Sequence, residues 1–191
     1  MTRPIIVKGQ RVGLAPLVED DLDKLWQWIN NKQVTQYTSH FTKFFNKKEQ
    51  QEWLESVMRG EQEETFGIMN LERNLLIGTC SLEERMKGSA SLGILIGEPS
   101  LWGEGLGSDA VRLLLDYGFN VLDLQCVWLF VGDYNMRAKR CYEKVGFKES
   151  DKIRQARHRG GTYHDMIVMD ILKEEFNSNF ESQIKKKCTG I

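Results

Sequence analysis

Three glycines alternate with other residues from Gly103 to Gly107, directly before an apolar, periodic segment that includes Ala110. The run Leu92 to Ile96, ahead of the glycines, is short and apolar, as is typical of a buried strand. Glycine lets the backbone approach a phosphate closely and adopt positive φ. The first free N–H groups of a helix attract an anion. The segment therefore predicts a site for a ligand that carries a diphosphate.

Two nucleotide-binding patterns can be compared with these glycines. A Walker-type loop requires G-x-x-x-x-G-K-[ST], and no Lys-Ser or Lys-Thr follows here, so that class of site is excluded. A dinucleotide loop can take the form G-x-G-x-x-A, which Gly105 to Ala110 satisfies, and Asp123 lies roughly 20 residues further on. However, an antiparallel meander is predicted before the loop and one further βα unit after it, which disfavours a dinucleotide fold.

The segment Trp102 to Ala110, WGEGLGSDA, resembles the pyrophosphate loop of the GNAT N-acetyltransferases, whose pattern is [QR]-x-x-G-x-G/A. The match is at Gly105 and Gly107. Trp102 stands where Gln or Arg is usual, and this variant resembles the subgroup of ribosomal-protein N-terminal (alanine/serine) acetyltransferases. A second segment, Asn135 to Phe147 (NMRAKRCYEKVGF), resembles the N-x-x-A-x-x-x-Y-x-x-x-G-F element of the same family.

The resemblance extends from Arg11 to Leu172 and implies a reaction. The expected activity is direct transfer of an acetyl group from acetyl-coenzyme A to a primary amine, in a ternary complex. The amine belongs to a small molecule or to a protein N-terminus, and no metal is expected. The alternative is a non-catalytic acyl-coenzyme A-binding module of the same fold, against which the retained Tyr142 argues.

The resemblance also implies where the co-substrate lies. Backbone N–H groups of the glycine loop would hold the diphosphate, and the pantetheine arm would pair like a strand with the residues just before the loop. Asn135 would contact the pantetheine arm. Lys139 and Arg140 either meet the adenosine 3′-phosphate or form a solvated face. The expected cofactor-binding residues are Leu95, Ile96, Trp102, Gly103, Glu104, Gly105, Leu106, Gly107, Ser108, Asn135, Lys139 and Arg140.

Tyr142 is the candidate general acid. Its i+7 spacing from Asn135 directs both side chains to the same side of a helix. A phenol with a pKa of about 10 can donate a proton to a departing thiolate and still be protonated at neutral pH. On the helix pattern alone, a core tyrosine with a satisfied hydroxyl is the better interpretation. The family resemblance of the surrounding residues reverses that preference.

The general base is less well defined, because Glu83, Glu84 and Glu98 all lie near the ends of predicted strands. The family resemblance implies that a strand-end carboxylate takes the proton of the amine, often through water. Solvated surface glutamates are the alternative for each of the three. Strand alternation predicts Glu84 on the face of Leu82 and Cys80, and Glu84 is therefore the candidate. Trp28 and Tyr37, in and after the first predicted helix, are candidates for the acceptor pocket.

The elements that must position these residues follow from hydrophobic periodicity and helix caps. Strands are expected at 11–18, 65–70, 75–82, 92–96 and 127–131, and a closing hairpin turns at Gly160-Gly161. Helices are expected after residue 21, over 46–58, after the glycine loop, and from Asn135 to Gly146. This order predicts an α/β (α+β) fold: a mixed, mostly antiparallel sheet with helices on both faces. Residues 1–175 would form one domain, and 176–191 a polar, mobile tail.

Composition narrows the function classes. The chain has 191 residues, 41% hydrophobic and 28% charged, with a formal net charge of −1, so its bulk charge indicates neither nucleic acid nor an anionic membrane as a partner. The four cysteines show no C-x-x-C spacing, which argues against a disulfide framework or a zinc cluster. No signal peptide or apolar span is apparent. We expect a cytoplasmic protein, either a monomer or a homodimer.

Overall fold

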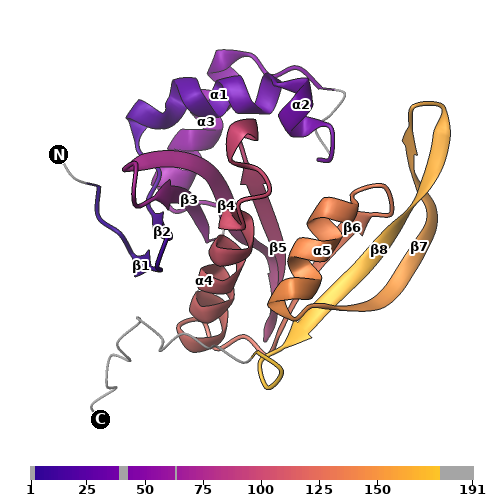
Figure 1. Ribbon diagram of the computed structural model, residues 1–191. Helices are drawn as coiled ribbons and strands as arrows, with labels where there is room; N and C mark the ends of the chain where they lie inside the picture. The colour runs from indigo at the N-terminus through magenta and orange to yellow at the C-terminus, as the bar shows by residue number, and fades with distance from the viewer. Residues whose placement is uncertain (1–2, 39–42, 63, 177–191) are drawn as a thin grey trace, which may run out of the picture.

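A single sheet runs through the computed structural model, which describes residues 3–38, 43–62 and 64–176 (Figure 1). Within these residues the strands are β1 (Val7–Lys8), β2 (Val12–Ala15), β3 (Thr65–Asn70), β4 (Leu75–Met86), β5 (Ser89–Ile96), β6 (Cys126–Gly132), β7 (Lys148–Arg159) and β8 (Thr162–Leu172). Their order across the sheet is β1-β2-β3-β4-β5-β6-β8-β7. Neighbouring strands are antiparallel, except for β5 and β6, which run parallel.

The helices are α1 (Leu22–Asn30), α2 (Lys32–Thr35), α3 (Lys47–Met58), α4 (Leu106–Asn120) and α5 (Met136–Val145). Asparagine side chains cap the beginnings of α2, α3 and α5, and a glycine ends α5. Before α3, the Asn46 side chain accepts from the Glu49 N–H at 2.9 Å, and the Glu49 carboxylate accepts from the Asn46 N–H at 2.8 Å. This capping box was expected, and replacing such a cap by alanine costs about 1 kcal/mol. Gly146 ends α5 with φ +117°, a left-handed conformation that suits glycine.

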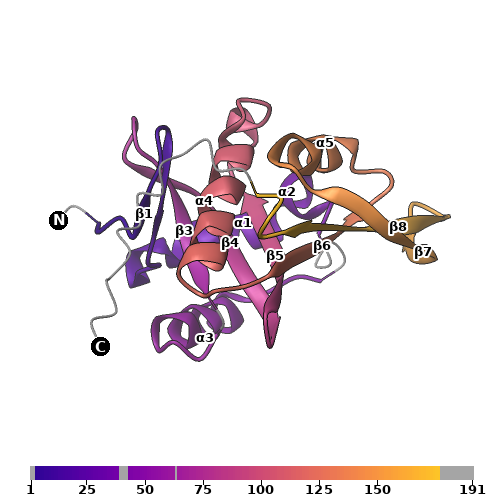
Figure 2. The ribbon, with the colours of Figure 1, turned by 90° about the horizontal axis from the view of Figure 1, so that it is seen from below.

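Helices cover both faces of the sheet (Figures 1 and 2). One face packs against α4 and contributes Ile68 and Leu82 to a buried cluster with Leu114 of that helix. The other face packs against α1 and α3, where Leu25 and Leu54 belong to a second buried cluster. At about 0.8 kcal/mol per buried CH₂, these two cores are the main stabilising contribution to the fold.

The sheet opens between β5 and β6. The two strands pair only where Ser89–Ser91 meets Cys126–Trp128. Beyond that point β6 pairs with β8 alone, and β5 pairs with β4 alone as far as Ile96. In the described part of the chain, no strand therefore occupies the second edge of β5 over residues 92–96. This gap in the middle of a sheet leaves backbone N–H and C=O groups available to a ligand.

The predicted fold class and element order are confirmed. The structure adds the short β1 strand and the single-turn helix α2, and it extends β4 to Met86. Phe176, the first residue of the predicted tail, packs its ring 5.3 Å from that of Phe119, between ring centroids. Residues 177–191 lie outside the described residues, so the tail stays a prediction. Within the described residues, no helix is long and apolar enough to cross a membrane.

Candidate active site

A cavity of about 1320 Å³ passes through the opening between β5 and β6. Its walls include Ser108 and Tyr142 on the side of α4 and α5, and Trp53 and Glu83 on the side of α1 and α3. Two ligands can therefore enter from opposite faces of the sheet and meet in the gap. Most of the residues expected at the co-substrate line this cavity: Leu95, Ile96, Trp102, Gly103, Gly105, Leu106, Gly107, Ser108, Asn135 and Arg140. Glu104 and Lys139 are not among its lining residues.

The glycine loop has the backbone that a phosphate cradle requires. Gly103 and Gly105 have φ of +85° and +83°, and Gly105 is the N-cap of α4. A Cβ on Gly103 would point into open space, whereas one on Gly105 would lie 3.0 Å from the Arg11 guanidinium. Arg11 braces the loop: it donates to the Glu104 carbonyl at 2.7 Å and to the Asp109 carboxylate at 2.8 Å. These hydrogen bonds fix the loop at the N-terminus of α4, where free backbone N–H groups and the helix dipole favour the binding of an anion.

Backbone groups of β5 point into the opening at alternate residues. Gly97 donates its N–H to Ile77 of β4, and the Leu95 carbonyl lies against Gly78 of the same strand. Because successive residues of a strand direct these groups to opposite edges, Ile94 and Ile96 direct theirs toward the open edge. Of the two expected residues, Ile96 is therefore available to a pantetheine arm, and Leu95 faces β4.

Trp102 joins the loop to this open edge. Its indole N–H donates to the Ile96 carbonyl at 2.9 Å. The guanidinium of Arg137, from the first turn of α5, lies 3.9 Å from the centroid of the Trp102 ring. The Trp102 ring is therefore fixed by two contacts: its N–H makes a hydrogen bond to Ile96, and its face makes a cation–π contact with Arg137.

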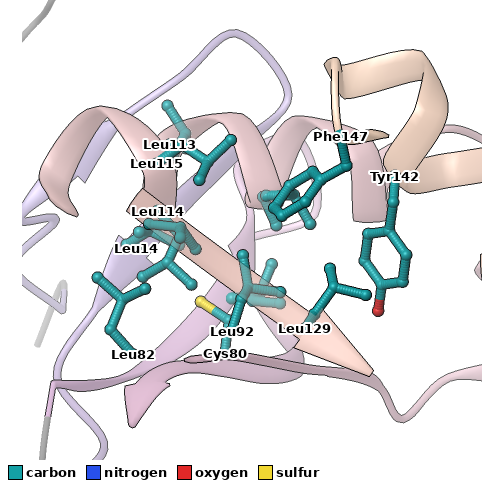
Figure 3. Packing of buried hydrophobic residues seen from close by; sticks show 14 of the residues in the cluster. Leu14, Cys80, Leu82, Leu92, Leu113, Leu114, Leu115, Leu129, Tyr142 and Phe147 are labelled. Carbon is teal, nitrogen blue, oxygen red and sulfur yellow. The ribbon is translucent and has the colours of Figure 1, made fainter. Parts of the chain in front are cut away.

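Tyr142 lies at the edge of the core, with 9% of its surface exposed. Figure 3 shows its ring beside Leu129 and its hydroxyl directed away from Phe147. Burial raises the pKa of the Tyr142 hydroxyl above its ordinary value. Among the described residues, no group hydrogen-bonds with this hydroxyl, and Tyr142 lines the cavity. The hydroxyl of Tyr142 is therefore not satisfied by a side chain or backbone group of the described residues.

Asn135 and Ser108 meet the cavity at the beginnings of two adjacent helices. Asn135 caps α5, where its side chain accepts from the Ala138 N–H at 3.2 Å. Ser108, in the first turn of α4, is 3.1 Å from the Cys141 sulfur. Burial raises the pKa of the Cys141 thiol, and the hydrogen bond with Ser108 opposes that rise. Cys141 therefore joins the two helices as a neutral thiol.

The basic residues of α5 divide into two groups. Lys139 forms ion pairs with Glu149 at 2.8 Å and with Glu143 at 3.9 Å, and the hydrogen bond to Glu149 raises the pKa of Lys139. Arg140 and Lys144 both line the cavity. Within the described part of the chain, neither has a carboxylate partner. Of the two expected 3′-phosphate residues, Arg140 faces the cavity and Lys139 is engaged elsewhere.

The alternation that predicted the direction of Glu84 ends just before it. The pairing of β4 with β5 shifts after Glu83, and Glu84 has φ +49°. Glu84 is exposed, while Leu82 and Cys80 are buried, and the bulge means that strand alternation no longer gives the direction of Glu84. Both glutamates line the cavity, and the Glu83 carboxylate accepts a 2.5 Å hydrogen bond from Ser81. Glu98 pairs with Lys24 at 3.3 Å.

Trp28 and Tyr37 line the cavity on the side of α1 and α2. Trp28 is buried and packs so closely on Gly97 that a Cβ there would lie 2.0 Å from its ring. Tyr37 stacks on Tyr134 at 6.2 Å between ring centroids. Arg157 of β7 donates to the carbonyl of Thr38 at 2.5 Å. The chain just after α2 is thus tied to the segment between β6 and α5 by Tyr37 and to β7 by Arg157.

Among the cavity and loop residues that the sequence interpretation missed are Arg11, Ile94 and Lys144. Arg11 carries no local signal, because its partners lie more than 90 residues later. Strand alternation directs the backbone groups of Ile94 toward the same edge as those of Ile96, so Ile94 can be found once the direction of Ile96 is known. Lys144 lies four residues after Arg140 on the same helix, so helical spacing alone could have placed Lys144 on the same side as Arg140.

Comparison with known proteins agrees with this geometry. Residues 11–148 match the family described as "Acetyltransferase (GNAT) domain". An uncharacterized N-acetyltransferase, p20, of Bacillus licheniformis is 26% identical over 171 residues, which cover 87% of this chain and 96% of that protein. A spermidine N(1)-acetyltransferase of Vibrio cholerae is 27% identical over 175 residues, which cover 91% and 99%.

Solved structures show the same fold. The crystal structure of spermidine N-acetyltransferase from Vibrio cholerae in complex with CoA and spermine superposes with a TM-score of 0.78 at 26% identity, and covers 88% of this chain and 99% of that one. A GNAT-family acetyltransferase from Bacillus anthracis has the same TM-score at 19% identity, with 88% and 99% covered. The chain belongs to the GNAT acetyltransferase family, and it is an acetyl-coenzyme A-dependent N-acyltransferase.

Proposed function

We propose that the chain transfers the acetyl group directly to a primary amine in a ternary complex. The observation that carries this proposal is the cavity that crosses the sheet between β5 and β6, with Tyr142 in its wall. Acetyl-coenzyme A enters on the side of α4 and α5, and the amine enters on the side of α1 and α3. Direct attack is then possible without a covalent enzyme intermediate, because both substrates reach the gap at the same time.

The residues that line the cavity suit acetyl-coenzyme A. Positive φ at Gly103 and Gly105 opens the loop for a diphosphate, and the open edge at Ile94 and Ile96 suits an amide-bearing pantetheine arm. An N–H on that edge would also stabilise the oxyanion that forms as the amine attacks the thioester. Arg140 and Lys144 supply positive charge for the 3′-phosphate. Asn135 keeps its role as a helix cap and offers its amide to the pantetheine arm.

Tyr142 would protonate the thiolate that leaves as the tetrahedral intermediate collapses. Its hydroxyl proton passes to sulfur as the carbon–sulfur bond breaks, and the proton that the attacking nitrogen loses as the amide forms restores the phenol. The raised pKa keeps the phenol protonated at neutral pH, and general acid catalysis of this kind contributes about 10²–10⁴ in rate.

The amine must first lose a proton. Glu84 remains the candidate base, and Glu83 is its neighbour on the cavity wall. Both carboxylates lie toward the acceptor side, where either one, directly or through water, would take the proton. The alternation argument for Glu84 no longer applies, so the assignment rests on exposure to the cavity, which the two residues share.

A cationic acceptor is favoured by the carboxylates that line the acceptor side: Glu49, Glu52, Glu83 and Glu84. Relatives named spermidine N(1)-acetyltransferases are consistent with such an acceptor. The variant loop Trp102–Gly107 favours a second candidate, a protein N-terminus, through its resemblance to ribosomal-protein acetyltransferases. The free thiols of Cys80, Cys126 and Cys141 suit a reducing, cytoplasmic setting.

The test is thiol release from acetyl-coenzyme A with a panel of acceptors. The panel contains spermidine, spermine, simple monoamines, and peptides that begin with alanine or serine. Turnover with an amine, with initial-rate patterns that intersect rather than run parallel, supports direct transfer in a ternary complex. Parallel patterns would contradict direct transfer, and binding of acetyl-coenzyme A without turnover on any acceptor would favour a non-catalytic module.

A further inference from the structure

The guanidinium of Arg137 occupies a defined position between two aromatic rings at the rim of the cavity. Its carbon Cζ lies 3.9 Å from the centroid of the Trp102 ring and 5.6 Å from that of Tyr37. Arg137 lines the cavity together with Gly103 and Gly105 of the loop. A cation from α5 is therefore held beside the segment that would receive the diphosphate.

This cation has no charge partner in the described residues. Among the described residues, no carboxylate lies within ion-pair distance of Arg137, and its guanidinium N–H groups donate no hydrogen bond. Three other basic groups near the loop are engaged: Arg11 and Arg112 both pair with Asp109, and Lys139 pairs with Glu149. Arg140 and Lys144 also lack a carboxylate partner among the described residues, and of these three cations of α5, Arg137 is the one whose guanidinium lies over the Trp102 ring of the loop.

Trp102 provides a fixed surface for the guanidinium. Its indole N–H is hydrogen-bonded to Ile96, which fixes the ring at the end of β5. Stacking on an aromatic ring uses the face of a guanidinium and leaves the N–H donors in its plane free for a bidentate contact with phosphate. Trp102 carries no charge itself, so the positive charge at this point of the loop comes from a different helix.

We infer that Arg137 binds the diphosphate of acetyl-coenzyme A, and that Trp102 is the positioning residue that holds its guanidinium over the loop. This inference rests on the proposed function, because it concerns the co-substrate of that reaction. It adds a side-chain cation to a site that otherwise binds through backbone N–H groups. The arrangement also explains why a tryptophan at this position is compatible with phosphate binding.

The experiment measures the dissociation constants of CoA and of pantetheine, which lacks the phosphates, by calorimetry. Arg137→Ala should weaken CoA binding by about tenfold to a hundredfold, the effect of a lost hydrogen bond to a charged group. Pantetheine binding should change by less than about twofold. Arg73→Ala, an exposed arginine in the β3–β4 turn that does not line the cavity, is the matched control and should change neither value.

Positioning by Trp102 is tested in the same assay. Trp102→Ala should weaken CoA binding about as much as Arg137→Ala, and the double variant should be no weaker than either single variant. Trp102→Phe retains a ring and should keep most of the affinity. Trp102→Arg in the Arg137→Ala background should recover CoA binding, because it restores a guanidinium from the loop itself.

Two outcomes would overturn the inference. One is unchanged CoA affinity in a folded Arg137→Ala variant; the other is an equal loss for CoA and pantetheine, which would indicate a structural role. Both leave the proposed function intact if the wild-type protein binds CoA and acetylates an amine. A wild-type protein that binds no CoA would overturn the inference and the proposed function together.

Discussion

The indole N–H of Trp102 donates a 2.9 Å hydrogen bond to the carbonyl oxygen of Ile96, the last residue of β5. This bond joins the glycine loop to the open edge of the sheet. Because the loop would hold the diphosphate and the edge would hold the pantetheine arm, it fixes the spacing between the two ends of the co-substrate.

Trp102→Phe should remove this bond and retain a ring beneath Arg137. One neutral hydrogen bond contributes about 1 kcal/mol, so the melting temperature should fall by about 2–4 °C. Affinity for CoA should stay within about threefold of wild type. Thermal unfolding and calorimetry on one preparation check both values. A large loss of affinity with unchanged stability would show that the N–H itself acts on the ligand.

Tyr142→Phe should lower kcat by about 10²–10⁴ and leave the KM for acetyl-coenzyme A within about threefold. The variant loses the proton donor and keeps the ring that packs beside Phe147. The pKa of Tyr142 is raised, so its ionisation should cause no loss of wild-type rate between pH 7 and about 10. Initial rates over this pH range give the result. An unchanged kcat in the variant would assign Tyr142 to the core alone.

Gly105→Val should raise the KM for acetyl-coenzyme A by about tenfold or more, which corresponds to at least 1.4 kcal/mol. The new Cβ lies against Arg11, and valine at φ +83° is strained by about 1–3 kcal/mol. The protein should also be less stable. Gly60→Val is the control, because Gly60 has φ +71°, open space around it and a place outside the cavity lining. It should lower stability and leave KM unchanged; an equal KM effect would remove the loop from the binding site.

Arg140→Ala should weaken the binding of CoA by about tenfold and that of 3′-dephospho-CoA much less, since a charge-assisted hydrogen bond to the 3′-phosphate is lost. Lys139→Ala should affect neither ligand, because Lys139 already pairs with Glu149. Calorimetry with the two ligands separates the two residues. Equal losses for CoA and 3′-dephospho-CoA in Arg140→Ala would place Arg140 elsewhere on the co-substrate.

The general base is tested by replacing Glu83 and Glu84 separately with glutamine. The residue that takes the amine proton should lose about 10²–10⁴ in kcat at neutral pH. Its variant should also recover rate as pH rises, because the fraction of amine that is already neutral increases. The other variant should keep the wild-type pH profile. Two variants with wild-type rates and profiles would indicate water or another group as the base.

Local sequence determined the elements that carry the chemistry. The capping box of Asn46 and Glu49, the glycine loop, and the helix from Asn135 to Gly146 depend on contacts within a few residues, so spacing alone predicts them. The two family segments likewise predicted acetyl-coenzyme A as the co-substrate and Tyr142 as the candidate general acid, a role that stays a proposal. Strand alternation predicted the sheet, but it failed at Glu84, where the bulge follows from pairing with β5 rather than from residue type.

Only the tertiary structure decided how these elements meet. The opening beside Ile96 exists because β6 diverges from β5 after Trp128 while it stays paired with β8 on its other edge, an arrangement of distant segments that no local pattern encodes. Two further contacts also join distant segments and have no local signal: the hydrogen bond from Arg11 to the Glu104 carbonyl, and the cation–π contact of Arg137 with the Trp102 ring. Side-chain charges are visible in a sequence, but their partners are set by folding. For that reason the sequence left Lys139 either at the 3′-phosphate or on a solvated face, and only the structure shows its pairing with Glu149.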